Sequence, residues 1–305
     1  MTAHNIPSKE QVKSYLTDRR NWGRWGAKGG AGATNLITPA KRLEATKLIR
    51  TGKTVSLSMP LSVEPSPRNP RPVQHYMKSE TDPNGRGGAS DYVGIYQHGY
   101  SVTHMDALCH VWDKDGMWDG KDPQEEITFN GAKYGSVDQF KDGIVTRGVL
   151  LDVPKYREKP HVTLDSPVHG WELEEIASSQ DVEIRRGDAV IVFCGRKSYM
   201  DTFSDGFTDG ADLPGLHGSC LPFIRDNDVA LLGWDMLDAV PNDSGVPMPM
   251  HSIINSYGVP ILDNTSLENL SATCLEENRY EFFLTVNPLV IVGGTGSPVN
   301  PIAIF

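Results

Sequence analysis

The clearest hydrophobic pattern lies in the middle of the chain, where two apolar runs are bounded by polar and glycine-containing segments. Residues 144–153 and 188–194 are rich in Val, Ile and Leu, and continuous apolar runs of this length are typical of strands buried on both faces. Residues 171–178 lie between them and carry acidic side chains in the first turn, which predicts a helix. A shorter apolar run at 229–234 predicts another buried strand. This order of strands and helices indicates an α/β core.

Towards the two ends of the chain, the spacing of apolar residues predicts further helices and strands. One apolar face predicts a helix over residues 8–20, and Thr38 followed by proline predicts a second helix that runs to about residue 50. Period-two alternation predicts a strand over 54–61. Near the C-terminus we expect a helix over 250–257 ended by a glycine, a strand pair over 280–292, and a closing glycine-rich loop over 293–298.

Two long polar segments separate these elements. Residues 65–88 are rich in proline and glycine and are predicted to form a surface loop, and residues 113–131 a second one. Residues 92–96 are predicted to begin the strand that leads into the histidines. No internal repeat or domain boundary is visible, so we expect one domain over 1–305, with the N-terminal extension of about 1–52 packed on it.

The chemistry concentrates at residues 97–110, which contain three of the nine histidines. His104 and Asp106 are two residues apart, so both side chains leave the same face of a strand, and His98 shares that face if the strand is unbroken. His110 lies four residues after Asp106 and stays near it if the chain turns helical. Imidazole and carboxylate groups are the usual ligands of zinc, manganese or ferrous iron. A hydrogen-bonded His–Asp pair without a metal is the competing interpretation.

Composition narrows the possible partners. The formal net charge of −10 and the sequence pI near 5.4 argue against nucleic acid or an anionic membrane as partner. The four cysteines are widely spaced and include no Cys-x-x-Cys pair, which favours free thiols in a reducing compartment. No apolar run approaches the ~20 residues needed to cross a bilayer. We therefore expect a cytoplasmic protein that acts on a small molecule.

A metal held by the early histidines would be completed from elsewhere in the chain, and the best distal candidate is His251. Asp263 follows twelve residues later, and an intervening helix, glycine turn and short strand would return it to His251. His98, His104, Asp106, His251 and Asp263 are therefore the candidate metal ligands.

These residues carry a family resemblance. Thr103-His104-Met105-Asp106-Ala107-Leu108-Cys109-His110 resembles the His-x-Gly-Thr-His-x-Asp-x-Pro-x-His signature of the metal-dependent cyclase family, which includes kynurenine formamidase and isatin hydrolase. The resemblance to the longer subgroup extends over most of the chain, through residues 22–26, 34–39, 215–222, 251, 261–263 and 294–298.

The resemblance implies a swivelling β/β/α domain with a β-rich mixed core and few short helices, and a hydrolase that opens amide, lactam or lactone bonds. By position, His104 and Asp106 would bind the metal, His110 would be the catalytic histidine, and His251 and Asp263 would serve a second metal in two-metal members. A homodimer or homotetramer is also implied.

The chain departs from the signature at three places. Tyr100 stands where the family has its first histidine, so His98 replaces that ligand only if the backbone bulges. Val102 and Leu108 replace the signature glycine and proline, and Asp263 replaces a glutamate. We therefore favour one divalent ion, zinc or manganese, with two ions as the lesser alternative.

The expected mechanism uses a metal-activated water, with His110 moving the proton between that water and the leaving group. Tyr100 is a candidate donor to the oxyanion. Trp22, Trp25 and His217 are candidate walls of the substrate pocket, although core packing is an equal or stronger expectation for each.

Two other functions remain open at this stage. A non-haem iron oxygenase would use His104, Asp106 and His251 as its triad, but it gives His110 no role. A non-catalytic binding protein would keep the fold with a degraded metal site.

Overall fold

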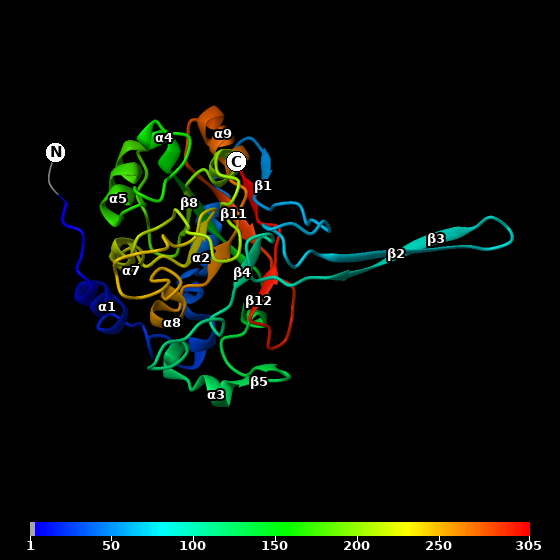
Figure 1. Cartoon of the computed structure of the whole chain (residues 1–305), viewed down its shortest axis with the longest axis horizontal. Coiled ribbons are helices and arrows are strands. Elements are labelled where there is room, and N and C mark those ends of the chain that lie inside the picture. Colours follow the sequence, from blue (N-terminus) through cyan, green and yellow to red (C-terminus); the bar gives the residue numbers. More distant parts are fainter. Residues whose placement is uncertain (1–3) are drawn as a thin grey trace.

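A nine-stranded mixed sheet forms the centre of the computed structural model, which describes residues 4–305 (Figure 1). Its strands lie in the order β1-β13-β11-β7-β8-β9-β10-β4-β12. The four strands β7, β8, β9 and β10 run parallel, and the flanking pairs are antiparallel. The strands are β1 Thr54–Ser56, β4 His104–Asp106, β7 Ile144–Asp152, β8 Ala189–Phe193, β9 Leu231–Trp234, β10 Ile261–Asp263, β11 Glu281–Val286, β12 Gly296–Pro298 and β13 Ile302–Ile304.

The apolar runs account for the centre of this sheet. Every residue of β8 and β9 is buried, as expected for parallel strands covered on both faces. The covering helices are short, since glycine and proline recur along the connections. They are α1 Lys9–Thr17, α2 Pro39–Thr46, α3 Pro123–Glu126, α4 Val153–Arg157, α5 Gly170–Ser179, α6 Arg196–Thr202, α7 Leu221–Asp226, α8 Ile253–Tyr257 and α9 Glu268–Glu277, with 3-10 turns η1 Gly26–Leu36, η2 Trp118–Gly120, η3 Val137–Phe140 and η4 Gly218–Cys220.

Most predicted elements are present with shifted ends. Strands β7, β8 and β9 and helices α1, α5 and α8 confirm the expected ones, and the mixed α/β fold with few short helices is also confirmed. Thr38 caps α2 through a hydrogen bond from the Lys41 amide, but the helix ends at Thr46 rather than near residue 50. The predicted strand pair over 280–292 is wrong, because only β11 forms there and the chain leaves the sheet after Val286.

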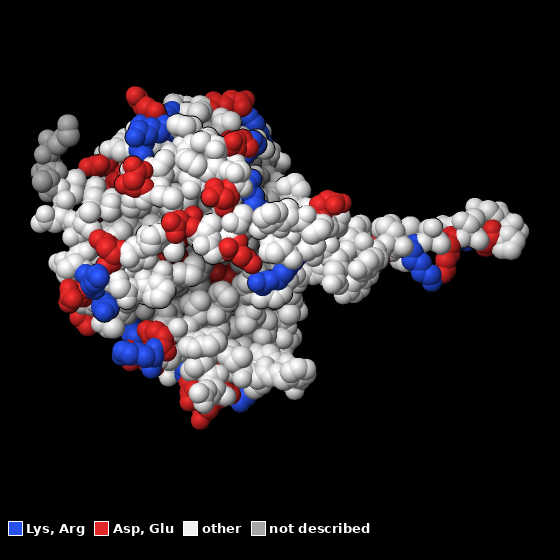
Figure 2. Space-filling model, in the orientation of Figure 1, with Lys and Arg blue, Asp and Glu red and all other residues white. Residues whose placement is uncertain are grey.

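The prediction of a surface loop over residues 65–88 is also wrong. Strands β2 (Gln74–Thr81) and β3 (Gly87–Gly94) pair as a hairpin that projects from the body as a long arm (Figure 1). Figure 2 shows the arm standing clear of the body on the face in view, with acidic and basic side chains interspersed over that face. All of β2 and nearly all of β3 is exposed. The two short strands β5 (Ile127–Thr128) and β6 (Gly131–Ala132) form a separate small hairpin.

The glycine-rich N-terminal segment packs behind the histidine stretch. Gly32 has a φ of +52°, and a Cβ there would stand 2.2 Å from the carbonyl oxygen of Gly258 and 2.6 Å from the Cδ1 of Leu108. Only glycine fits this close approach. The segment therefore supports the turn that joins Asp106 to His110. Among residues 4–305, none of the helices has the length and hydropathy needed to span a bilayer.

Candidate metal centre

Short strand β4 lies between β10 and β12, and this pairing brings the early and distal carboxylates together. His104 is the antiparallel partner of Asp263, and Asp106 is the partner of Ile261. The whole of β4 and β10 is buried. Because residues two apart share a face of a strand, the side chains of His104 and Asp106 point to the same side, as the sequence predicts.

His104 presents its Nε2 atom to both carboxylates. Its Nδ1 atom lies 2.8 Å from the carbonyl oxygen of Val102, so Nδ1 carries the proton and Nε2 is left to act as a ligand. That Nε2 lies 3.2 Å from Asp106 Oδ1 and 3.9 Å from Asp263 Oδ2.

His98 and His110 approach Asp106 from the other side. The two imidazole rings stack with centroids 3.8 Å apart. His98 Nδ1 lies 3.0 Å from Asp106 Oδ1, and His110 Nε2 lies 3.9 Å from the same oxygen. The side chains of His98 and His110 are 22% and 25% exposed, whereas that of Asp106 is 1% exposed. Solvent therefore reaches the cluster over these two rings.

His98 reaches the cluster from a loop. The expected unbroken strand is absent, since β3 ends at Gly94 and β4 begins only at His104. Gly99 has a φ of +139°, which L side chains rarely adopt. The backbone therefore bends between His98 and Tyr100, in the way that replacement of the missing first histidine requires.

His251 completes the cluster from the turn just before α8. Its Nε2 atom lies 3.8 Å from Asp263 Oδ2 and 4.0 Å from Asp106 Oδ2. Its Nδ1 atom is 2.5 Å from Asp238 Oδ2, and Asp238 Oδ1 accepts a hydrogen bond from the Met250 amide. Asp238 thus fixes the ring orientation of His251. Sequence reasoning missed Asp238; its signal was an acidic residue within the apolar run Met236-Leu237-Asp238-Ala239.

Asp263 is held so that one oxygen remains available. The indole N–H of Trp234 donates to Asp263 Oδ1 over 2.6 Å, and the Asn264 amide donates to the same oxygen over 3.0 Å. Oδ2 then faces the imidazoles of His104 and His251. The shorter side chain of aspartate does not keep this carboxylate away from the cluster.

The donor atoms converge without satisfying one another. Both carboxylate oxygens of Asp106 and the Nδ1 atom of His98 are buried and make no well-directed hydrogen bond, although His98 Nδ1 and His104 Nε2 stand 3.0 and 3.2 Å from Asp106 Oδ1 and buried polar atoms are normally paired. Ligands at 2.0–2.2 Å from one ion stand about 3.0–3.5 Å from each other, and the separations seen here run from 3.0 to 4.0 Å. The residues therefore fit a divalent metal ion.

The donors divide into two triads that share Asp106. His98, Asp106 and His110 form one, and His104, Asp106 and Asp263 form the other; within each, one potential ligand atom per residue lies within 4.8 Å of the others. Both one ion and two ions are compatible with this arrangement.

Buried charges shift the pKa values of the cluster in opposite directions. Burial lowers the pKa of His104, but Asp106 and Asp263 outweigh burial and raise it to about 9. The Asp238 carboxylate likewise outweighs burial and holds the pKa of His251 well above its usual range. For Asp106, burial is outweighed by the nearby His110 and His104, so its pKa is well below the usual range. Metal ligation needs neutral imidazoles, so an ion must displace protons from His104 and His251.

His110 behaves differently from its neighbours. Burial lowers its pKa to about 4, even though Asp106 acts in the opposite direction. The ring is therefore neutral at pH 7. A neutral imidazole at the exposed edge of the cluster is able to accept a proton.

Tyr100 and His217 take positions that the sequence did not define. The Tyr100 ring meets Phe207 edge to face, with centroids 6.0 Å apart, and burial raises the pKa of its hydroxyl. His217 is buried, lies 3.0 Å from Asp243, and caps η4 by accepting from the Ser219 amide. These contacts give His217 a local structural role, and no hydrogen bond within residues 4–305 joins it to the cluster.

Trp22 and Trp25 anchor the N-terminal segment. The Trp22 indole donates to the Asn255 carbonyl over 2.6 Å, and the Trp25 ring packs on Trp118 with centroids 5.7 Å apart. In the described part of the chain neither ring stacks on or hydrogen-bonds to the histidine–aspartate cluster. These contacts place both rings against the N-terminal segment and its neighbours, and their role as pocket walls stays a prediction.

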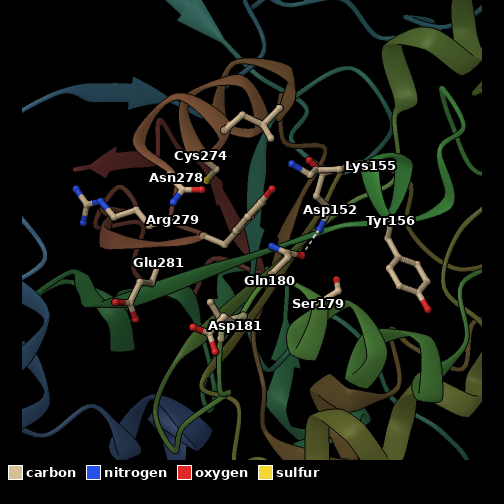
Figure 3. Close-up of a pocket in the computed structure, with 13 residues that line it drawn as sticks. Asp152, Lys155, Tyr156, Ser179, Gln180, Asp181, Cys274, Asn278, Arg279 and Glu281 are labelled. Atoms are coloured by element: carbon tan, nitrogen blue, oxygen red, sulfur yellow. Dashed lines mark hydrogen bonds between the residues drawn. The ribbon is translucent and has the colours of Figure 1, made fainter.

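A cavity of about 690 Å³ lies at another part of the sheet, between α4, α5 and α9 (Figure 3). Two of the acidic side chains that line it, Asp152 and Glu281, already have partners. Asp152 accepts from the Lys155 amide and from the Ser271 hydroxyl, and Glu281 pairs with Arg147. β7 is separated from β4 by three intervening strands, so this cavity is not part of the cluster.

Comparison with known proteins agrees with this architecture. The family model described as "Putative cyclase" matches residues 55–239. A crystal structure described as a novel cyclase is 27% identical, covers 94% of this chain and 99% of its own, and superposes with a TM-score of 0.79. None of the curated proteins compared with the chain matches it.

Isatin hydrolases share the fold at lower identity. One bound to the product analogue thioisatinate is 18% identical over 87% of this chain and 94% of its own, with a TM-score of 0.56. Isatin hydrolase A from Ralstonia solanacearum is 21% identical over 87% of this chain and 97% of its own, with a TM-score of 0.55. With a family model that matches more than half of its length, the chain belongs to the cyclase family.

Proposed function

We propose that this protein is a metal-dependent hydrolase that opens an amide, lactam or lactone bond in a small molecule. The observation that carries the proposal is the convergence of unpaired, buried donor atoms on Asp106. A structural core would align these atoms in well-directed hydrogen bonds, whereas here several imidazole nitrogens crowd one carboxylate without such alignment, as ligands around an ion do.

His104, Asp106, Asp263 and His251 are the residues that would hold the ion at the buried side, and His98 joins them through Asp106. Their nitrogen and oxygen donors suit zinc or manganese. When bound, such an ion lowers the pKa of a coordinated water to about 7 and polarises the carbonyl that is attacked. We retain one ion as the working stoichiometry, and the second triad gives a specific place for another.

His110 is the residue we assign to proton transfer. Its neutral imidazole stands at the exposed edge of the cluster, on the side from which a substrate enters. In the proposed reaction it accepts the proton from the attacking water and returns it to the leaving nitrogen or oxygen, so the proton balance closes within one turnover. A positioned group of this kind contributes about 10²–10⁴-fold to the rate.

The comparisons support a cyclic amide as the first substrate class to test. An isatin hydrolase with this fold binds thioisatinate, a product analogue. We propose cyclic amides as substrates of this protein, together with formamides and lactones. We also keep Tyr100 as a candidate donor to the oxyanion, since it follows the bend that carries His98.

The competing functions explain less of the site. An iron oxygenase triad of His104, Asp106 and His251 leaves three further donors without a role. A binding protein with a degraded site does not explain why His98 lies beside Asp106 when Tyr100 has replaced the first histidine of the family signature.

The test separates metal binding from catalysis. His110→Gln should retain the metal content of the wild type, while turnover of isatin, an aryl formamide or an aromatic lactone falls about 10²–10⁴-fold. His75→Gln is the matched control, because His75 lies on the exposed arm and its partner among residues 4–305 is Asp91. Full activity in His110→Gln would remove His110 from the mechanism. Absence of hydrolysis by the metal-loaded wild type across all three classes would refute the proposed function.

A further inference from the structure

The loop that carries His98 into the cluster is held by hydrogen bonds to its backbone. A Cβ placed on Gly99 would find nothing within 4 Å, so side-chain packing at that residue does not define the bend. The position of His98 therefore depends on what holds the carbonyl groups of Gly99 and Tyr100, together with the contact of its own Nε2 atom with the Thr295 hydroxyl over 2.9 Å.

Asn264 holds the first of these carbonyls. Its side-chain Nδ2 atom donates to the Gly99 carbonyl oxygen over 2.6 Å, and its backbone carbonyl oxygen accepts from the Thr103 hydroxyl over 2.6 Å. Asn264 is fully buried and has a φ of +53°, a conformation that asparagine tolerates better than most residues. It directly follows Asp263, so one residue links the distal carboxylate to the loop of His98.

Arg196 fixes the orientation of the Asn264 amide. Its Nη1 atom donates to Asn264 Oδ1 over 2.5 Å, and its Nη2 atom donates to the Tyr100 carbonyl. Because Oδ1 is taken by Arg196, the donor nitrogen of the amide must face Gly99. The guanidinium also lies 4.1 Å from the centre of the Phe207 ring. The planar fork of arginine thus holds the loop and the asparagine in one arrangement.

We infer that Asn264 and Arg196 are positioning residues that hold the Gly99–Tyr100 backbone and thereby place the His98 imidazole against Asp106. This inference rests on the proposed metal site and explains how the chain keeps a histidine there with Tyr100 at the position of the family's first histidine. Neither residue contacts the ion or the substrate in this scheme. Both act through His98.

Asn264→Gly is the most direct test. Glycine adopts a φ of +53° without strain and adds no charge, but it removes the hydrogen bond to Gly99. Loss of a residue that orients a ligand typically lowers metal affinity about 10–100-fold. Asn69→Gly is the matched control, because Asn69 is also buried and its Nδ2 atom also donates to loop carbonyls, those of Ser62 and Glu64.

A double-mutant cycle shows whether Asn264 acts through His98. Zn²⁺ affinity is measured by competition with a chromophoric chelator for the wild type, Asn264→Gly, His98→Ala and the double variant. We expect Asn264→Gly to weaken binding at least tenfold in the wild type and less than threefold in His98→Ala. An equal loss in both backgrounds would overturn the inference, and so would unchanged affinity in Asn264→Gly. Arg196→Lys, which keeps the charge but not the fork, is the second variant, and we expect a loss of the same sign.

A metal-independent readout separates this inference from the metal site itself. In 15N-histidine-labelled, metal-free protein, Asn264→Gly should shift the imidazole resonances of His98, whereas Asn69→Gly should leave them unchanged. Unshifted His98 resonances would overturn the positioning role. A wild type that binds neither Zn²⁺ nor Mn²⁺ would refute the proposed function, and the imidazole spectra would still decide the positioning role.

Discussion

The Asp238–His251 pair offers a prediction whose size follows from the local geometry. Asp238 is fully buried and receives two donors, the Nδ1–H of His251 and the amide of Met250. Asparagine at this position has only one acceptor oxygen, so its NH₂ group must face one of the two donors. The least costly adjustment is a change of tautomer in His251, which moves the ring proton to Nε2. The nitrogen that faces Asp106 and Asp263 is then no longer a ligand.

We expect Asp238→Asn to lower metal affinity about 10–100-fold. Asp238→Ala should also destabilise the protein by about 3–5 kcal/mol, because it leaves a buried cationic imidazole without its partner. Affinity is measured by chelator competition, and stability by urea unfolding of metal-free protein.

Asp188→Asn is the control for this prediction. Asp188 is equally buried and pairs with Lys41 and Arg147 at a distance from the cluster. The Asp188→Asn variant should be less stable than the wild type but bind the metal with the same affinity. Wild-type affinity in Asp238→Asn would refute the assignment of His251 as a ligand.

Two further predictions concern pH and assembly. The folded pKa of His104, about 9, exceeds the unfolded value of about 6.5, so its stabilising effect is complete below pH 6.5 and is lost as pH rises through 9. At about 1.4 kcal/mol per pH unit, the metal-free protein should lose about 3 kcal/mol in urea unfolding between pH 6.5 and 9, and a rise in stability would contradict the charge pairing. The homodimer or homotetramer remains a prediction, and the exposed arm is the contact we expect, since an isolated two-stranded hairpin is at best marginally stable. Joining Gln74 to Gly94 through a short glycine linker should reduce the mass measured by light scattering to that of a monomer; an unchanged mass would place the contact elsewhere.

The centre of the fold was predictable because burial there is uniform. Strands β7 and β8 contain continuous apolar runs, so they must be covered on both faces of the sheet. The arm has no such constraint, since its exposed strands carry a mixed pattern. Its turn, Asp82-Pro83-Asn84-Gly85, was the available signal, because an Asn-Gly step between two short runs favours a hairpin.

The site was predictable where spacing along one element sets the geometry. His104 and Asp106 share a face because they are two residues apart on β4. His98 reached the predicted neighbourhood by another route, through a bend at Gly99 rather than along a strand. Asp238 depended on pairing between distant segments, which residue spacing does not reveal.

Expected partners and location follow from composition and remain predictions. The net charge of −10 still argues against nucleic acid and anionic membranes as partners, and a cytoplasmic location is the expectation from the cysteines. The single 1–305 domain with its packed N-terminal extension is likewise a prediction.

The measurement that tests the central claim most directly is elemental analysis of the protein purified without chelator or histidine tag, alongside His104→Ala. We predict about one zinc or manganese ion per chain in the wild type and loss of that ion in the variant. Close to two ions per chain would assign the second triad as well. No metal in the wild type, even after incubation with zinc or manganese, would contradict the account.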